Sequence, residues 1–253
     1  MKHILLFAVL CTMPFLSAAP ATFRPKVSVE KVENFDFTTG IDHPAWNKCK
    51  SYDLMAIVRE CKDINTAPRE KGSAKLLYDD KYFYVRADFC DSDIMTTATE
   101  NGGHFYLQGD LVEVFLKPAN ANYYWEIYGT PNKLNTRFYF TSRSTVGTPS
   151  SFTHQDTGIK VASKIYGTLN YPGDKDKGMV ILVAIPIAEL NRPHTDKDHP
   201  AGTVPFAPGH EWRMLIARYN YSRYLDETDY SSFPQILVSY HALEYFAELE
   251  LLK

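Results

Sequence analysis

The segment from 74 to 128 decides the fold of this chain. It reads AKLLYDDKYFYVRADFCDSDI at 74–94 and GDLVEVFLKPANANYYWEIY at 109–128. Each half contains alternating side chains that a turn-forming cluster interrupts, at 79–81 and at 118–122. Alternation with a period of two is typical of strands that bury one face and leave the other to solvent. We therefore predict two antiparallel hairpins here.

The rest of the chain repeats this strand pattern without an internal repeat or a change in composition. Only one short helical turn is expected, near 186–190, because Pro186 suits the start of a helix. The remaining strands are predicted at 27–32, 54–58, 134–146, 159–169, 179–185, 209–219 and 247–252. Many short strands separated by turn signals favour two packed sheets. The predicted fold class is all-β, an antiparallel β-sandwich of the jelly-roll type, forming a single domain over 25–253.

The N-terminal segment has the features of a signal peptide. Lys2 gives a positive start, 4–16 is mostly apolar, and small residues near 19–21 offer a cleavage site. The apolar run is too short to span a bilayer. We predict a signal peptide at 1–21, a secreted or periplasmic protein and no membrane partner after cleavage. A retained membrane anchor is the alternative.

Composition and cysteine spacing narrow the choice of partners. A formal net charge of -3 argues against nucleic acid as a ligand. Export permits disulfides, and Cys49 and Cys61 flank a short segment that a disulfide could close. Unpaired, buried cysteines are the alternative. No C-x-x-C pair is present, so no zinc site is indicated.

The loop between the two predicted hairpins carries acidic and aromatic side chains. Asp91, Asp93 and Asp110 offer carboxylate oxygens, which calcium prefers, so they are candidate ligands for a structural calcium ion. Phe105 and Tyr106 follow two flexible glycines and are candidates for the rim of a binding site. The alternative is that these rings plug the sandwich.

The order of several motifs along the chain resembles one family. The motifs are LLYDDKYFYVRADFCDSDI (76–94), GDLVEVFLKP (109–118), YWEIYGTPNKLNTRFYF (124–140), VAIPIAEL (183–190), PGHEWRMLIARYN (208–220) and YHALEYFAELELL (240–252). Over 27–253 this succession resembles carbohydrate-binding module family 9-like proteins, within the DOMON-like superfamily. The resemblance implies a β-sandwich that grips sugar in a surface cleft, often beside xylanase-type enzymes, with structural calcium in some members.

The resemblance also implies a set of sugar-binding residues. Family members hold a sugar between two tryptophans, and Phe105, Tyr106 and Phe233 occupy the corresponding neighbourhoods here. Glu113 and Glu126 match two acidic positions on successive strands. Two more candidates are Arg218 and Asn220. The alternative for either glutamate is a half-buried ion pair with Arg137 or Arg218.

The predicted function is that of an exported, non-catalytic carbohydrate-binding protein that assists the breakdown of xylan- or glucan-type polysaccharide. Its partners would be a carbohydrate and polysaccharide-degrading enzymes. One alternative is a glycoside hydrolase that uses Glu113 and Glu126 as its carboxylate pair. The other is a haem-binding DOMON-like electron-transfer domain, whose candidate axial ligands are Met95, His104, Met214 and His241.

Overall fold

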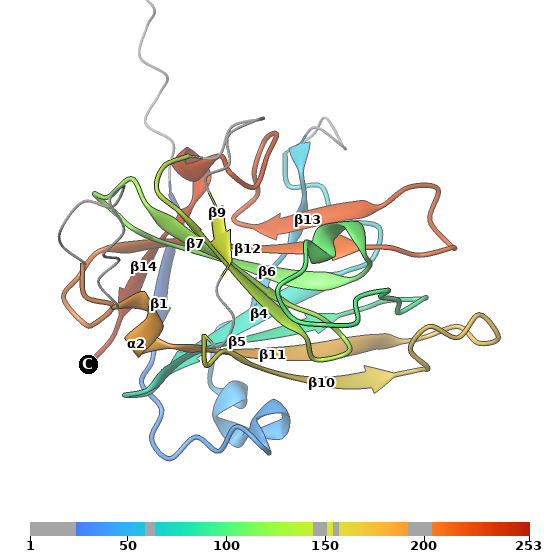
Figure 1. The fold of residues 1–253 in the computed structure, drawn as a ribbon, viewed down its shortest axis with the longest axis horizontal. Coiled ribbons are helices and arrows are strands. Elements are labelled where there is room, and N and C mark those ends of the chain that lie inside the picture. The colour runs from blue at the N-terminus through green and yellow to red at the C-terminus, as the bar shows by residue number, and fades with distance from the viewer. Residues whose placement is uncertain (1–23, 59–63, 144–150, 154–156, 192–203) are drawn as a thin grey trace, which may run out of the picture.

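The computed structural model describes residues 24–58, 64–143, 157–191 and 204–253, and the backbone of 151–153. In these ranges the chain forms two sheets that face each other, with only short helical turns between strands (Figure 1). The predicted all-β sandwich is therefore confirmed. The predicted signal peptide and Cys61 lie outside the described residues. None of the helices in the described part of the chain has the length and apolar character needed to span a bilayer.

The larger sheet contains nine strands and is antiparallel except for one pair at its edge, β1 with β14. Strands β13 and β3 extend it beside β12. The strands follow the order β1 (Lys26–Val29), β14 (Ala247–Leu251), β12 (Trp212–Asn220), β6 (Leu111–Pro118), β7 (Tyr124–Gly129), β8 (Asn135–Phe140) and β9 (Ser151–Thr153), with β13 (Asp229–Phe233) and β3 (Met55–Ala56) at the side. The sequence analysis missed β13, because acidic residues precede it.

The smaller sheet is antiparallel and has five strands. Its order is β10 (Lys160–Tyr166), β11 (Gly178–Pro186), β5 (Tyr82–Phe89), β4 (Gly72–Tyr78) and β2 (Tyr52–Asp53). The short helices are η1 (Gly40–Asp42), η2 (Pro44–Asn47), η3 (Phe105–Leu107), α2 (Ile187–Leu190) and η4 (Leu243–Tyr245). Helix α2 follows directly after Pro186, where the helical turn was predicted.

Both predicted hairpins are present, and they belong to different sheets. The turn between β4 and β5 is held by the Asp79 carboxylate, which accepts hydrogen bonds from the backbone N–H groups of Lys81 and Tyr82 at 2.7 Å each. Strands β6 and β7 pair over five residues in the larger sheet. The loop between the hairpins therefore crosses from one layer to the other.

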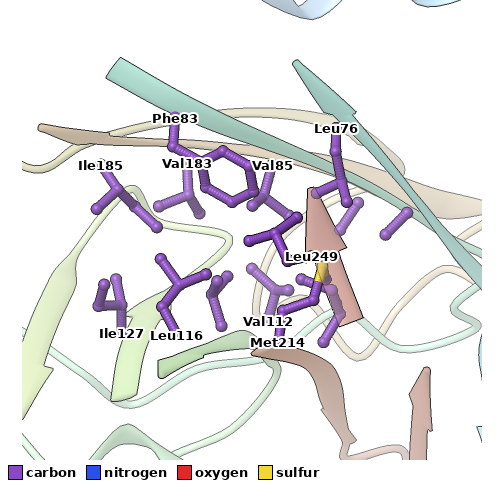
Figure 2. Close-up of a cluster of buried hydrophobic side chains, with 14 of the residues drawn as sticks. Leu76, Phe83, Val85, Val112, Leu116, Ile127, Val183, Ile185, Met214 and Leu249 are labelled. Atoms are coloured by element: carbon purple, nitrogen blue, oxygen red, sulfur yellow. The ribbon is translucent and has the colours of Figure 1, made fainter. Parts of the chain in front are cut away.

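The inter-sheet core consists of the apolar side chains that alternation assigns to one face of each strand. Phe83, Val85, Val183 and Ile185 from the smaller sheet face the larger sheet. Val112, Leu116, Ile127, Met214 and Leu249 face them from the opposite side (Figure 2). All of these side chains are buried. Removing this apolar area from water is the main contribution that holds the two layers together.

The outer faces of both sheets are less exposed than simple alternation predicts. Tyr84 on β5 alternates with Phe83 and Val85 of the inter-sheet core, yet it is buried with Trp46 beneath the segment that contains η1 and η2. A second apolar cluster covers the outer face of the larger sheet and includes Phe115, Tyr124 and Phe246. Long connections, which alternation within strands does not reveal, therefore cover part of each outer face.

Gly178 at the start of β11 occupies a position that only glycine suits. Its φ is +142°, and a Cβ atom there would lie 2.2 Å from the carbonyl oxygen of Phe89. We expect Gly178→Ala to lower the free energy of unfolding by about 2 kcal/mol, through backbone strain and displacement of β5. Urea denaturation measures the change. Gly209→Ala is the control, because Gly209 has φ +88° and open space around it. Equal losses in both variants would show that the contact with Phe89 contributes nothing.

Candidate functional site

A pocket of about 300 Å³ lies on the outer face of the larger sheet. This volume is at the lower end of the range for small-molecule sites. Strands β6, β7, β8 and β12 form its floor, and connections at 57, 104–106 and 238–241 form its sides. The lining residues are Ile57, His104, Tyr106, Glu113, Phe115, Glu126, Tyr128, Phe138, Phe140, Tyr219, Val238, Ser239, Tyr240 and His241.

Two carboxylates lie side by side on the floor of this pocket. Glu113 on β6 pairs directly with Tyr128 on β7, and Phe115 pairs with Glu126. The two glutamates are therefore diagonal neighbours on one face, roughly 7–8 Å apart at the backbone. Both are almost fully buried. The Tyr128 hydroxyl donates a hydrogen bond to Oε1 of Glu126.

Burial makes it costly for these two carboxyl groups to ionise. Loss of hydration raises the pKa of Glu113 well above its usual value, and the neighbouring Glu126 raises it further. Burial also raises the pKa of Glu126, to about 7, against the opposing effect of the Tyr128 hydroxyl. Two like charges this close do not ionise independently, so the pair retains a proton over part of the neutral range.

His241 stands beside the acid pair without neutralising it. Its Nδ1 lies 2.7 Å from the Tyr124 hydroxyl, and its Nε2 lies 3.6 Å from Oε2 of Glu126. Burial lowers the pKa of His241 to about 4, and the charge of Arg143 acts in the same direction. The imidazole is therefore neutral near pH 7, and the described pocket lining contains no lysine or arginine to pair with the two glutamates.

Aromatic rings form the walls of the pocket. The Tyr106 ring lies 5.9 Å from Tyr219 and 5.8 Å from His104, centroid to centroid. His104 in turn stacks on Phe138 at 4.8 Å. His104 and Val238 are solvent-exposed, so they mark the side on which the pocket opens. The arrangement places polar acceptors at the bottom and flat apolar surfaces at the sides, which suits a ligand with both polar and apolar faces.

Three of the residues that the sequence proposed lie together in this pocket: Tyr106, Glu113 and Glu126. Phe105 is buried behind it, in the cluster that covers the outer face, with its ring 6.1 Å from that of Tyr128. The sequence analysis did not single out several lining residues on the strands, namely Phe115, Tyr128, Phe138, Phe140 and Tyr219. Strand alternation is a signal that could have found them, because each shares a face with Glu113 or Glu126.

Arg218 and Asn220 were expected beside the glutamates, but they project from the opposite face of the sheet. On β12 they alternate with Ala217 and Tyr219, and Ala217 is the residue that pairs with Glu113. Arg218 is fully buried, with its guanidinium 4.5 Å from the centroid of the Phe89 ring. It donates to Asp91 at 2.9 Å, and Asn220 donates to Glu70 at 2.9 Å. The structure therefore places both in a structural polar network.

Phe233 was expected to provide one side of an aromatic clamp, but the structure places it at the inter-sheet core. It pairs with Ile216, whose side chain faces the smaller sheet, and its ring lies 4.7 Å from that of Tyr52. All three tryptophans of the chain, Trp46, Trp125 and Trp212, are also buried. Among the residues described, tyrosine and phenylalanine therefore supply the aromatic walls of the pocket.

The alternative that the two glutamates form ion pairs with arginine is wrong. Arg137 pairs with Glu189 of α2, and both side chains are buried. Arg218 pairs with Asp91. Both arginines face away from the pocket because each is one position out of phase with the residues that line it.

The three aspartates considered for calcium are each bound to protein donors. Asp91 accepts from Arg218, Asp93 accepts from Arg223, and Asp110 accepts from the backbone N–H groups of Met95 and Tyr221 at 2.7 Å each. Over the described ranges, no group of three or more acidic, His or Cys side chains has the spacing of a metal site. These contacts favour a structural role, and calcium stays a prediction.

The remaining sequence-based candidates do not converge on one place. Met214 lies in the inter-sheet core, whereas His104 and His241 line the pocket on the other face of the same sheet. Met95 belongs to the loop that crosses between the sheets, where its carbonyl accepts from Asp110. This placement gives no support for paired haem ligands. The Cys49 thiol lies 3.4 Å from the Ala45 carbonyl oxygen, and its predicted bond to Cys61 stays a prediction.

Solved structures with a similar fold support this description. A proposed carbohydrate-binding protein from Bacteroides uniformis matches with a TM-score of 0.65 and 14% identity, over 91% of this chain and 100% of that one. Two structures of a carbohydrate binding module family 9 from Caldicellulosiruptor kristjanssonii also match. The complex with cellotriose has a TM-score of 0.51 at 13% identity, covering 89% of this chain and 93% of that one. The complex with glucose has a TM-score of 0.53 at 13% identity, covering 90% and 95%.

The family comparison covers the two hairpins and the loop between them. No curated protein sequence matches the chain. The model of the carbohydrate family 9 binding domain-like family matches residues 39–173, which is more than half of the chain. The chain therefore belongs to the carbohydrate family 9 binding domain-like family.

Proposed function

We propose that this protein is an exported, non-catalytic carbohydrate-binding protein, and that the pocket on the outer face of the larger sheet is where it holds sugar. One observation supports this most strongly: buried carboxylates with free acceptor positions lie at the bottom of a pocket walled by aromatic rings. Sugar hydroxyls are hydrogen-bond donors, and the C–H faces of a sugar ring pack on aromatic planes. Relatives of the same fold were solved with cellotriose and glucose, which suggests glucan- or xylan-type ligands.

The same geometry favours binding over hydrolysis. Glycoside hydrolysis requires two carboxyl groups that flank the scissile bond. Glu113 and Glu126 project from neighbouring strands of one sheet in the same direction, so they approach a ligand from one side. We therefore place the protein beside polysaccharide-degrading enzymes as an accessory that holds substrate. Release of reducing sugar from xylan or glucan by the purified protein would contradict this.

Titration calorimetry of the purified protein with glucose, cellotriose and xylotriose tests the proposed function. We expect saturable binding to at least one of these sugars. Tyr106→Ala should weaken it about tenfold, because a contact between a sugar ring and an aromatic plane is worth about 1 kcal/mol or more. Tyr166→Ala is the control, since Tyr166 is a half-exposed ring on β10 in the other sheet. Binding that is unchanged in Tyr106→Ala would reject this pocket, and no binding to any tested sugar would reject the proposed function.

A further inference from the structure

The part of the pocket lining that the structure describes contains acidic groups and neither lysine nor arginine. This described lining holds two glutamates, two histidines and four tyrosines. Of the arginines near it, Arg137 is paired with Glu189 and Arg143 with Glu244. Such a pocket attracts positive charge, and its low exposure to water strengthens that attraction.

The acid pair also has buried acceptor positions that no described residue fills. Each carboxylate has about four acceptor positions. The Tyr128 hydroxyl donates to Oε1 of Glu126. Oε2 of Glu113 and Oε2 of Glu126 accept no hydrogen bond from the described residues, although both are buried. An unfilled buried acceptor is costly, so a ligand that brings several donors is favoured at this point.

The aromatic rings of the pocket add a third feature that suits a cation. Rings of Tyr106, Phe115, Phe138, Phe140 and Tyr219 surround the acid pair. The faces of such rings carry partial negative charge and attract an ammonium group. A neutral sugar hydroxyl offers one donor and no charge, whereas an ammonium group offers three donors together with the charge.

We propose that the pocket binds a sugar that carries a protonated amino group, a hexosamine, in preference to the corresponding neutral sugar, with the ammonium group placed between Glu113 and Glu126. This rests on the proposed function, because it names the class of carbohydrate that the same pocket holds. The ammonium group supplies donors to the two Oε2 atoms that accept no hydrogen bond from the described residues, and it compensates the like charge of the two carboxylates.

Binding of the ammonium group is coupled to loss of a proton from the acid pair. The pKa values of Glu113 and Glu126 are raised, so the empty pair holds a proton that the incoming cation displaces. The other titratable groups that face the pair are Tyr128 on β7, Tyr219 on β12, His104 and Tyr106 on one side, and Tyr240 and His241 on the other, with Arg143 beyond His241. Because the pair carries more charge at higher pH, affinity for the hexosamine should rise with pH until the amine itself loses its proton.

Titration calorimetry with glucosamine, N-acetylglucosamine and glucose tests the proposal on the full protein. At pH 7 we expect glucosamine to bind at least tenfold more tightly than either neutral sugar. Repeating the titration in two buffers of different ionisation enthalpy should show proton release with glucosamine and none with glucose. Glu113→Gln and Glu126→Gln should each remove most of the preference, whereas the exposed Glu248→Gln should leave it unchanged.

The outcomes separate this proposal from the proposed function. Glucose binding without any preference for glucosamine would overturn the hexosamine assignment and leave the sugar-binding function in place. Tighter binding of N-acetylglucosamine would overturn it as well, because that ligand has the same ring without the charge. Failure of all three ligands and of the oligosaccharides above would overturn both. The comparison of the three ligands uses the unaltered protein, so it does not depend on whether the variants fold.

Discussion

Arg218→Met is expected to lower the free energy of unfolding by about 3–5 kcal/mol, because it leaves a buried carboxylate without its cation. The Arg218 guanidinium is fully buried and donates to Asp91 at 2.9 Å and to the Glu70 carbonyl at 3.1 Å. Burial raises the pKa of Asp91 to about 6 even with Arg218 in place. Without Arg218 the carboxyl group must ionise unpaired or take up a proton. Urea denaturation at pH 5 and pH 8 measures the loss, which should be larger at pH 8.

The double variant Asp91→Asn/Arg218→Met is the matched control. It removes the buried charge together with its partner, so we expect it to recover at least half of the stability that the single variant loses. Sugar binding should remain in folded protein, since Arg218 faces away from the pocket. A single variant within about 1 kcal/mol of the unaltered protein would contradict a structural role for this ion pair.

The double variant Glu113→Gln/Glu126→Gln is expected to become more stable than the unaltered protein as pH rises. The folded pKa of Glu113 is raised well above its usual value, and that of Glu126 is about 7 against 4.5. Between those values the folded state binds more protons than the unfolded state. The contribution of the pair to the free energy of unfolding is therefore fully present below about pH 4.5 and is lost as pH rises. The shift of Glu126 alone corresponds to a loss on the order of 3 kcal/mol. Urea denaturation between pH 4 and pH 8.5 measures the difference between the two proteins.

Other buried groups with shifted pKa values are present in both proteins, so the prediction concerns the difference between their two stability curves. Burial raises the pKa of Asp91 and Asp110 and lowers that of His241, and all three are retained in the variant. Glu248→Gln removes an exposed carboxylate and should follow the unaltered protein across the pH range. Parallel curves for the acid-pair variant and the unaltered protein would show that Glu113 and Glu126 ionise normally in the fold.

The alternation of side chains along the sequence was sufficient to predict the strands and to separate the two faces of each strand. Alternation over 74–128 puts each of Val85, Val112 and Trp125 on one defined face of its strand, and the structure buries all three between the sheets. Turn residues such as Asp79 fixed the hairpin that joins β4 to β5, because their side chains bond to the backbone a few residues away. Such contacts join residues that are close in sequence, so the sequence alone reveals them.

The pairing of distant strands decided which residues share the pocket. Arg218 was expected beside Glu113, but in the register of β12 on β6 the residue opposite Glu113 is Ala217. A shift of one residue moves a side chain to the other face of a sheet. The register between strands therefore decides whether that side chain lines the pocket or lies in the inter-sheet core. No strand was predicted around Phe233 for the same reason, because its strand exists only by pairing with β12 and β3.

By itself, the sequence determined an all-β chain with two hairpins and the acidic positions Glu113 and Glu126. The tertiary structure alone decided that these two carboxylates lie together, that Tyr106, Tyr219 and His241 come from distant segments to surround them, and that Arg218 does not. The physical reason is that alternation is a property of one strand, whereas a pocket depends on the register between strands and on the loops that cover a face.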